Sequence, residues 1–321
     1  MKGKHEILVR NARVQYKFAV ERNITILRGD SATGKTTLID MIATYQRAGE
    51  KSGVELRSDK PCVVLTAQNW QLNLGQVHES IVFIDEGDPF VRSKDFAQAV
   101  DGSDNYFVIA TRAPLFNLPY SIKEIYGIRN KSGNLYQGTK RLYAEFFPLV
   151  DVKAETEAIP DLVIVEDKNA GFEFFQNYFR RYGIRCITAE GKSNIFSKLL
   201  AESYQTALVI ADGAAFGPEI ERILDLRQIK SLIIYLPESF EWLVLRSDVL
   251  DDHEIIDILE APAEHIASED YFSWERFFTA VLTQRSHGTY LEYHKNSLNK
   301  NYLQDSITDR IATKMPELHL K

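Results

Sequence analysis

Short apolar runs alternate with amphipathic stretches over the first half of the chain. Residues 5–20 alternate loosely between apolar and polar positions, which predicts an antiparallel hairpin. Apolar residues at helical spacing after Lys35 predict a helix at that point. Short runs that are apolar throughout are typical of a parallel sheet that is buried on both faces. The runs predicted as such strands are 23–27, 63–65, 80–84 and 106–110.

The second half of the chain repeats the alternation after an irregular stretch. Residues 148–161 contain two prolines and several acids without periodicity, which predicts a linker. Strands and helices then alternate, which indicates a second parallel α/β domain. From about residue 237 the pattern is helical, and Trp274, Phe277, Phe278, Val281 and Leu282 mark one helix face. We therefore expect an α/β chain divided into 1–150, 151–240 and a helical region 241–321. The strands expected in the second domain are 162–165, 184–188, 207–210 and 231–235, and the helices are 172–182, 194–201 and 218–226.

Composition narrows the class of protein. The chain has 321 residues, of which 45% are hydrophobic and 26% charged, enough apolar material for two domain cores. The net charge of −7 argues against a surface built for non-specific binding to DNA or membranes. No apolar run is long enough for a signal peptide or a membrane span. Because Cys62 and Cys186 lie far apart among apolar neighbours, we expect buried free thiols and a cytoplasmic protein.

Residues 29–36, Gly-Asp-Ser-Ala-Thr-Gly-Lys-Thr, match the phosphate-binding pattern G-x-x-x-x-G-K-[ST] between a predicted strand and a predicted helix. The glycines let the backbone wrap a phosphate, and the loop N–H groups and the helix N-terminus supply positive potential. Lys35 is expected to reach the β- and γ-phosphates, and the Thr36 hydroxyl to hold Mg²⁺. The predicted ligands are therefore ATP and Mg²⁺. The residues expected to bind them are Gly29, Asp30, Ser31, Ala32, Thr33, Gly34, Lys35, Thr36 and Thr37.

Acidic and polar residues follow two of the other predicted strands. Asp85 and Glu86 end the apolar run 81–84, which predicts Asp85 as a Mg²⁺ ligand and Glu86 as the general base that activates water. Paired acids after a strand are also found as helix caps. Thr111 and Arg112 follow the strand 106–110 and are candidates for contacting the γ-phosphate, Arg112 in its own chain or in a neighbouring subunit. The alternative is a polar strand end followed by a surface arginine.

Residues 1–150 resemble a short ABC-type or related P-loop ATPase domain. The resemblance rests on the hairpin, the strand 24–27 and the sequence Arg-Gly-Asp-Ser-Ala-Thr-Gly-Lys-Thr-Thr. It implies that Glu86 is catalytic, that Thr111 senses the γ-phosphate and that Gln68 links this phosphate to conformational change. Tyr16 matches either an adenine-stacking aromatic residue or a core tyrosine. A Leu-Ser-Gly-Gly-Gln-like signature is missing between the P-loop and Asp85, which argues against an ABC-style sandwich dimer.

Residues 162–236 resemble a Toprim-like domain. In that family a glutamate ends the first strand, an Asp-x-Asp pair ends a later one, and the carboxylates bind Mg²⁺ for phosphodiester chemistry. Glu166 and Asp212 match these elements, but Ala214 replaces the second aspartate and Asp167 replaces the usual glycine. Glu166, Asp167 and Asp212 would then form one weaker metal site. The alternatives are a non-catalytic Toprim-like scaffold and a flavodoxin-like or receiver-like arrangement with an acidic pocket at its strand ends.

An ATPase followed by a Toprim-like domain resembles the OLD-family ATPase–nucleases and uncharacterised ATP-binding proteins of bacterial mobile elements and phages. The resemblance implies a Mg²⁺-dependent ATPase whose cycle changes the relation between its domains, in a DNA- or mobile-element-related process. An ATP-gated scaffold with little turnover and an ATP-regulated nuclease are the alternatives. Nucleic acid, a protein partner and a second copy of the chain stay open as partners, and a membrane is not expected.

Overall fold

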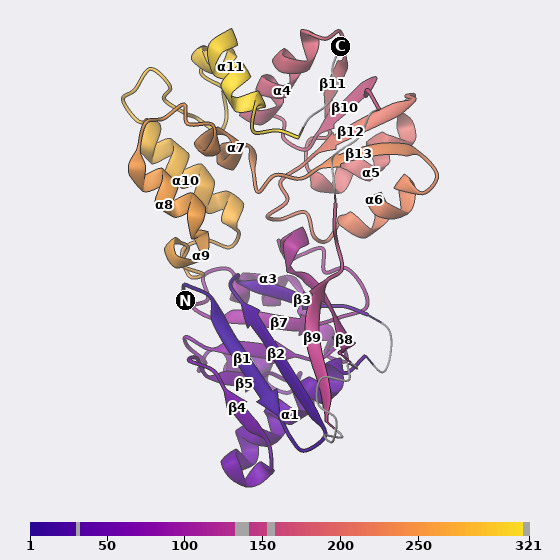
Figure 1. Ribbon diagram of the computed structural model, residues 1–321, viewed down its shortest axis with the longest axis vertical. Coiled ribbons are helices and arrows are strands. Elements are labelled where there is room, and N and C mark those ends of the chain that lie inside the picture. The colour runs from indigo at the N-terminus through magenta and orange to yellow at the C-terminus, as the bar shows by residue number, and fades with distance from the viewer. Residues whose placement is uncertain (30–32, 132–140, 153–157, 317–321) are drawn as a thin grey trace. The chain divides into compact units, whose positions relative to one another are not determined.

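A computed structural model describes residues 1–29, 33–131, 141–152 and 158–316 of the chain. The fold is mixed α/β, with a large sheet that contains parallel strands and a second sheet that is parallel throughout (Figure 1). The chain forms two compact units. Unit 1 comprises Met1–Val150 and Ala261–Ser273, and unit 2 comprises Asp151–Glu260 and Trp274–Lys321. The helical region expected at 241–321 is thus divided between the two units.

The sheet of unit 1 has nine described strands in the order β4-β1-β2-β9-β8-β3-β7-β6-β5. Neighbours from β8 to β5 are parallel, and the hairpin predicted at 5–20 is confirmed as the antiparallel pair β1–β2. β9 connects the hairpin to the parallel strands, because it is parallel to β2 on one side and antiparallel to β8 on the other. The strands are β1 His5–Arg10, β2 Val14–Val20, β3 Ile24–Leu27, β4 Glu55–Arg57, β5 Cys62–Val64, β6 Ile81–Ile84, β7 Tyr106–Ala110, β8 Ile125–Asn130 and β9 Leu142–Pro148.

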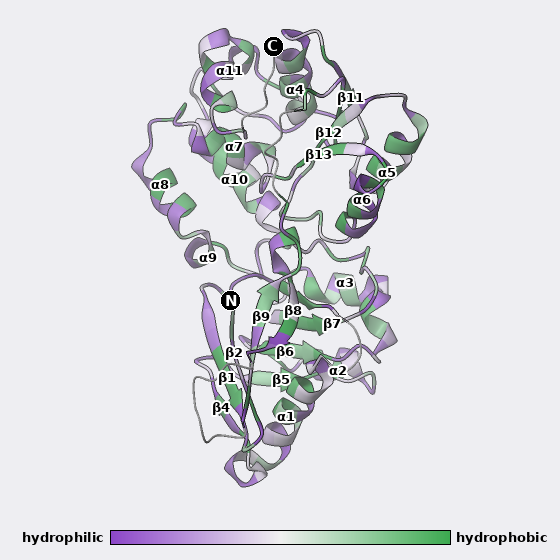
Figure 2. Ribbon diagram, turned by 45° about the vertical axis from the view of Figure 1, so that its right-hand side comes forward, coloured by the Kyte–Doolittle hydropathy of each residue, from purple (hydrophilic) through white to green (hydrophobic). Residues whose placement is uncertain are grey.

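Apolar side chains cover both faces of the central strands β6 and β7, which carry the hydrophobic colour in Figure 2. Val108 belongs to the same core cluster as Leu38 and Ile42 of the helix α1 (Lys35–Ala48). Phe107 is the next residue and therefore points to the opposite face. There its ring centroid lies 5.8 Å from that of Phe96, edge to face. The helices and turns on this part of the chain are α2 Trp70–Leu74, α3 Lys94–Val100, η1 Gly49–Ser52, η2 Pro89–Arg92 and η3 Ile122–Glu124.

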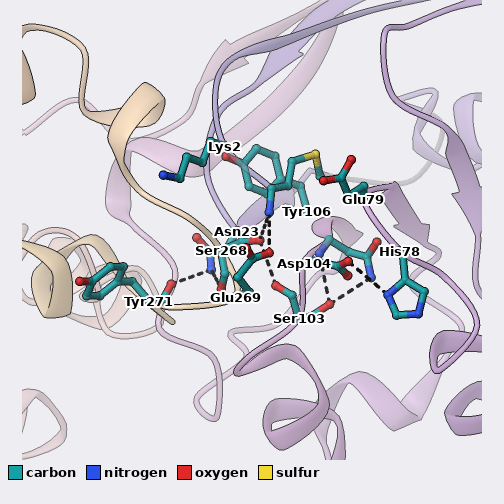
Figure 3. A network of polar contacts seen from close by, with 12 residues as sticks. Lys2, Asn23, His78, Glu79, Ser103, Asp104, Tyr106, Ser268, Glu269 and Tyr271 are labelled. Carbon is teal, nitrogen blue, oxygen red and sulfur yellow. Dashed lines mark hydrogen bonds and ion pairs between the residues drawn. The ribbon is translucent and has the colours of Figure 1, made fainter.

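Residues 261–273, which we call the return segment, belong to unit 1 although they follow most of unit 2 in sequence. The side-chain amide of Asn23 donates to the carbonyl oxygens of Ser268 at 3.2 Å and Tyr271 at 2.9 Å (Figure 3). The Ser268 hydroxyl donates to the carbonyl oxygen of Ser103 at 2.9 Å. Asn23 precedes β3 and Ser103 precedes β7, so the return segment is tied to the amino-terminal ends of two central strands.

Unit 2 contains a four-stranded parallel sheet in the order β11-β10-β12-β13. All four strands predicted from the sequence are confirmed, and the predicted apolar face of α10 is buried. The strands are β10 Leu162–Val165, β11 Arg185–Thr188, β12 Thr206–Ile210 and β13 Ser231–Tyr235. The helices are α4 Ala170–Arg180, α5 Lys192–Ala201, α6 Ile220–Arg227, α7 Phe240–Arg246, α8 His253–Glu260, α10 Trp274–Ser286, α11 Asp305–Ala312 and the turn η4 Lys300–Leu303; α9, Pro262–His265, lies in the return segment.

Across the described ranges, no helix combines the length and the apolar character that a membrane span requires.

The Asn23 side chain ties the return segment to the sheet of unit 1. N23A removes both hydrogen bonds to the return segment, each worth about 1 kcal/mol. We expect amide hydrogen exchange in 261–273 to accelerate roughly thirtyfold, because local opening becomes easier, while exchange in α10 stays unchanged. The matched control is N299A, since the Asn299 amide also donates to two backbone carbonyls, those of Tyr290 and Glu292, but within unit 2. Equal exchange in 261–273 for N23A and wild type would contradict the assigned role.

Candidate functional site

Three neighbouring parallel strands of unit 1 end together at one edge of the sheet. β7 lies between β3 and β6. Leu27 at the end of β3 pairs with Ala110 at the end of β7, and Ile84 at the end of β6 pairs with Ile109. The carboxyl ends of such strands form the edge at which α/β sheets place their ligands. The residues that leave this edge are Arg28 and Gly29 after β3, Thr111 and Arg112 after β7, and Asp85 and Glu86 after β6.

The described part of the predicted phosphate loop has the backbone that its glycines allow. Gly29 has φ 135° and Gly34 has φ 99°, both in the region that disfavours side chains. Lys35 is 5% exposed, and its ammonium donates to the carbonyl oxygen of Gly29 at 2.6 Å and to Thr33 Oγ1 at 3.1 Å. The lysine therefore folds back along its own loop. The predicted phosphate-binding residues Asp30, Ser31 and Ala32 lie outside the described residues.

Tyr16 of β2 supports the start of α1. Its hydroxyl donates to the carbonyl oxygen of Gly34 at 3.0 Å and is also hydrogen-bonded by the side chain of Thr37. Tyr16 is 2% exposed and belongs to the core cluster of unit 1, and burial raises its pKa. A Cβ atom on Gly34 would lie 2.8 Å from the tyrosine hydroxyl oxygen. Space as well as backbone conformation therefore requires glycine at this position.

Glu86 and Arg112 form an ion pair with two hydrogen bonds at the same edge. Arg112 donates from Nε at 3.2 Å and from Nη2 at 2.7 Å to the two carboxylate oxygens of Glu86. These bonds, and more weakly the charge of Lys35, hold the pKa of Glu86 below its usual value despite partial burial. Asp85 Oδ1 accepts the Glu86 N–H at 2.8 Å. The side chains of Asp85, Glu86 and Arg112 thus meet at this edge, and Lys35 begins the helix α1 that follows β3 in the chain.

The remaining predicted residues of this site differ in their surroundings. Thr111 is 3% exposed, and its hydroxyl donates to the carbonyl oxygen of Ala113 at 2.8 Å. Thr36 and Thr37 are exposed in the first turn of α1, and Gln68 is exposed after β5. The Thr36 hydroxyl and the Asp85 carboxylate supply the hard oxygen atoms that Mg²⁺ prefers. A magnesium ion held mainly by phosphates and water needs only one or two protein ligands of this kind.

Unit 2 has an acidic cleft of about 260 Å³ at the carboxyl ends of β10 and β12. It gathers the predicted Glu166, Asp167 and Asp212 together with three further carboxylates and two lysines. No group of three or more His, Cys, Asp or Glu in the described ranges is arranged to hold a metal ion. The charged residues lining the cleft are Glu166, Asp167, Lys168, Glu190, Asp212, Glu241, Glu275 and Lys295.

The three predicted acids have different roles within the cleft. Asp167 accepts the backbone N–H groups of Lys168 at 2.7 Å, Asn169 at 3.1 Å and Gly171 at 2.8 Å, so it shapes the turn into α4. Glu166 accepts the Asp212 N–H at 3.0 Å. Burial, together with the nearby charges of Glu275 and Asp167, raises the pKa of Glu166 to about 7, although the Asp212 N–H and Lys192 oppose the shift. Burial and the neighbouring carboxylates raise the pKa of Asp212 as well.

Lys295 is one of the two lysines that line this cleft, and it pairs with two of the carboxylates. Its ammonium lies 2.7 Å from Glu275 Oε1 and 3.8 Å from Glu241 Oε1. The Glu241 side chain is 3% exposed and also accepts the Tyr293 hydroxyl at 2.8 Å. Burial disfavours the charged lysine, but Glu241 and Glu275 outweigh it and raise its pKa. The helical spacing of apolar residues after residue 237 does not predict these polar contacts. The one hint in the sequence is Glu241, an acidic residue among the apolar residues of α7.

No protein-family model and no curated protein matches this chain. The functional assignment therefore rests on the residues and their geometry.

The raised pKa of Glu166 gives a prediction with a definite sign. Between about pH 4 and pH 7 the folded chain keeps a proton on Glu166 that the unfolded chain has lost, so stability falls as pH rises through this window. E166Q cannot ionise and keeps an acceptor for the Asp212 N–H. We expect E166Q to exceed wild type in unfolding free energy by about 3 kcal/mol at pH 8, and the two to converge toward pH 4.

Urea denaturation of the full chain across this pH range measures the difference. E190Q is the control, because Glu190 lines the same cleft but is exposed. A difference between E166Q and wild type that does not vary with pH would contradict the assignment.

Proposed function

We propose that unit 1 binds ATP with Mg²⁺ and hydrolyses it, and that this cycle acts on unit 2. The proposal is supported by the residues that meet at one edge of the sheet. The ends of β3, β7 and β6 bring a lysine next to a glycine loop, an acidic pair and an arginine to a single sheet edge. Such a set supplies the groups that phosphoryl transfer to water uses: a cation for the phosphates, an oxygen ligand for the metal, a base for the water and a second cation for the developing charge.

The side chains at this edge have separate roles in the proposed hydrolysis. Lys35 neutralises the β- and γ-phosphates after leaving the carbonyl oxygen of Gly29. Thr36 and Asp85 hold Mg²⁺, which when bound would polarise the phosphate oxygens. Glu86 accepts a proton from the attacking water. Arg112 stabilises charge on the γ-phosphate, and Thr111 keeps the end of β7 in place through its bond to Ala113.

The second candidate is an ATP-gated binding module with little turnover. The ion pair between Arg112 and Glu86 favours this candidate, because the arginine engages the carboxylate that hydrolysis would need as a base. The order of the two units, through its resemblance to OLD-family ATPase–nucleases, supports a role in a DNA- or mobile-element-related process. If unit 2 is a nuclease, Mg²⁺- or Mn²⁺-dependent DNA nicking would require Glu166.

K35A tests the nucleotide site itself. We expect this variant to lose ATP hydrolysis by at least about a hundredfold and to bind ATP weakly, because the buried cation that meets the phosphates is gone. Phosphate release by purified protein with Mg²⁺ measures turnover, and fluorescent ATP measures binding. K51A removes an exposed lysine just beyond the other end of α1 and should behave as wild type. Undiminished turnover in K35A would refute the assignment.

E86Q separates the enzyme from the binding module. If Glu86 is the general base, we expect turnover to fall by at least about a hundredfold while ATP binding is retained. The control is E202Q, because Glu202 has a similarly exposed ion pair, with Arg185 at 2.7 Å, in unit 2. Slow turnover that is the same in wild type and E86Q would favour the binding module.

A further inference from the structure

The position of Glu86 depends on Arg112. The pair is bidentate, with donor–acceptor distances of 3.2 and 2.7 Å, and it joins the residues that follow the adjacent strands β6 and β7. The Glu86 side chain is 26% exposed and that of Arg112 is 60% exposed, so the arginine side chain is accessible from solvent.

A guanidinium binds carboxylate and phosphate through the same fork of N–H donors. A terminal phosphate carries more negative charge than a carboxylate, and Arg112 cannot present the same two donors to both. Lys35, which would contact that phosphate, begins the helix after β3, and β3 pairs with β7, whose end carries Arg112. A γ-phosphate beside Lys35 therefore competes with Glu86 for Arg112.

We propose that Arg112 is a positioning residue that exchanges partners, from the Glu86 carboxylate to the γ-phosphate, so that a triphosphate releases the base that attacks it. The inference rests on the proposed function of unit 1. A diphosphate lacks the competing group and leaves Glu86 held by Arg112. The exchange links the freedom of the base to the presence of its substrate and limits activation of water before the triphosphate has bound.

Thr111 is not the residue that links the end of β7 to Glu86. Its hydroxyl is buried and bonded to the Ala113 carbonyl oxygen, and the Ala113 N–H donates back to it at 3.2 Å. Arg112 is the next residue, and its side chain reaches across to the end of β6. The contact between the two strand ends therefore runs through the arginine.

A double-mutant cycle tests the exchange. The variants are wild type, E86Q, R112K and E86Q/R112K, and the ligands are a non-hydrolysable βγ-imido ATP and ADP, each with Mg²⁺. R112K keeps the positive charge but not the bidentate fork. Titration calorimetry gives Kd, and thermal midpoints verify that each variant is folded.

E86Q weakens the hold on Arg112, so we expect it to bind the triphosphate about fivefold more tightly than wild type, the scale of a partly exposed ion pair. In the R112K background the same change should tighten binding less than about twofold, because the bidentate pair is already lost. Relief of the repulsion between Glu86 and the phosphate occurs in both backgrounds and therefore cancels in the comparison. ADP binding should change less than about twofold throughout. E202Q should leave both ligands unaffected.

Equal tightening by E86Q in both backgrounds, or equal tightening for ADP, would overturn the exchange while leaving the ATP site intact. If wild type and all variants fail to bind the triphosphate, the proposed function falls and the exchange falls with it. If R112K does not fold, E86Q alone decides between the two ligands, because the exchange requires tightening that is confined to the triphosphate.

Discussion

The parallel pairing of β7 with β3 on one side and β6 on the other is the constraint on which the candidate site depends. Each strand is short and fully buried, so its register is fixed by apolar contacts on both faces. The residue after each strand must then emerge at one edge, whatever its chemistry. A shift by one residue would turn Phe107 and Val108 to the wrong faces and would separate Arg112 from Glu86.

Charge compensation is the second organising feature, and it takes a different form in each unit. In unit 1 the Glu86 carboxylate is held by an exposed arginine, which can be drawn away by another anion at modest energetic cost. In unit 2 Glu241 is almost fully buried and is held by Lys295 and Tyr293. Breaking a buried pair costs more than breaking an exposed one. The geometry therefore suits exchange of partners in unit 1 and a persistent arrangement in unit 2.

Much of the fold could be predicted, because apolar runs and their spacing reflect burial directly. The strands of unit 2 and the face of α10 follow from this pattern. The acids after β6 and β10 could also be located, since a strand end is visible in sequence. Ion pairing with Arg112 could not, because the direction of a long side chain depends on the neighbouring strand and not on its own segment.

The place of the return segment and the contacts of Lys295 could not be predicted from the sequence, for the same reason. The return segment has no periodicity that assigns it to unit 1; hydrogen bonds from Asn23 and Ser268 do so across more than half of the chain. Lys295 lies among turns, and its contacts with Glu241 and Glu275 join three separate segments. Such polar contacts over long sequence distances carry little local signal, although they decide the charge of a site.

A crystal structure of the full chain with βγ-imido ATP and Mg²⁺ tests most directly whether this sheet edge binds the triphosphate. We expect the β- and γ-phosphates beside Lys35, at the edge formed by the ends of β3, β7 and β6, with Asp85 and Thr36 facing the metal. A triphosphate bound elsewhere, or a nucleotide-soaked crystal with this edge unliganded at saturating nucleotide, would contradict it.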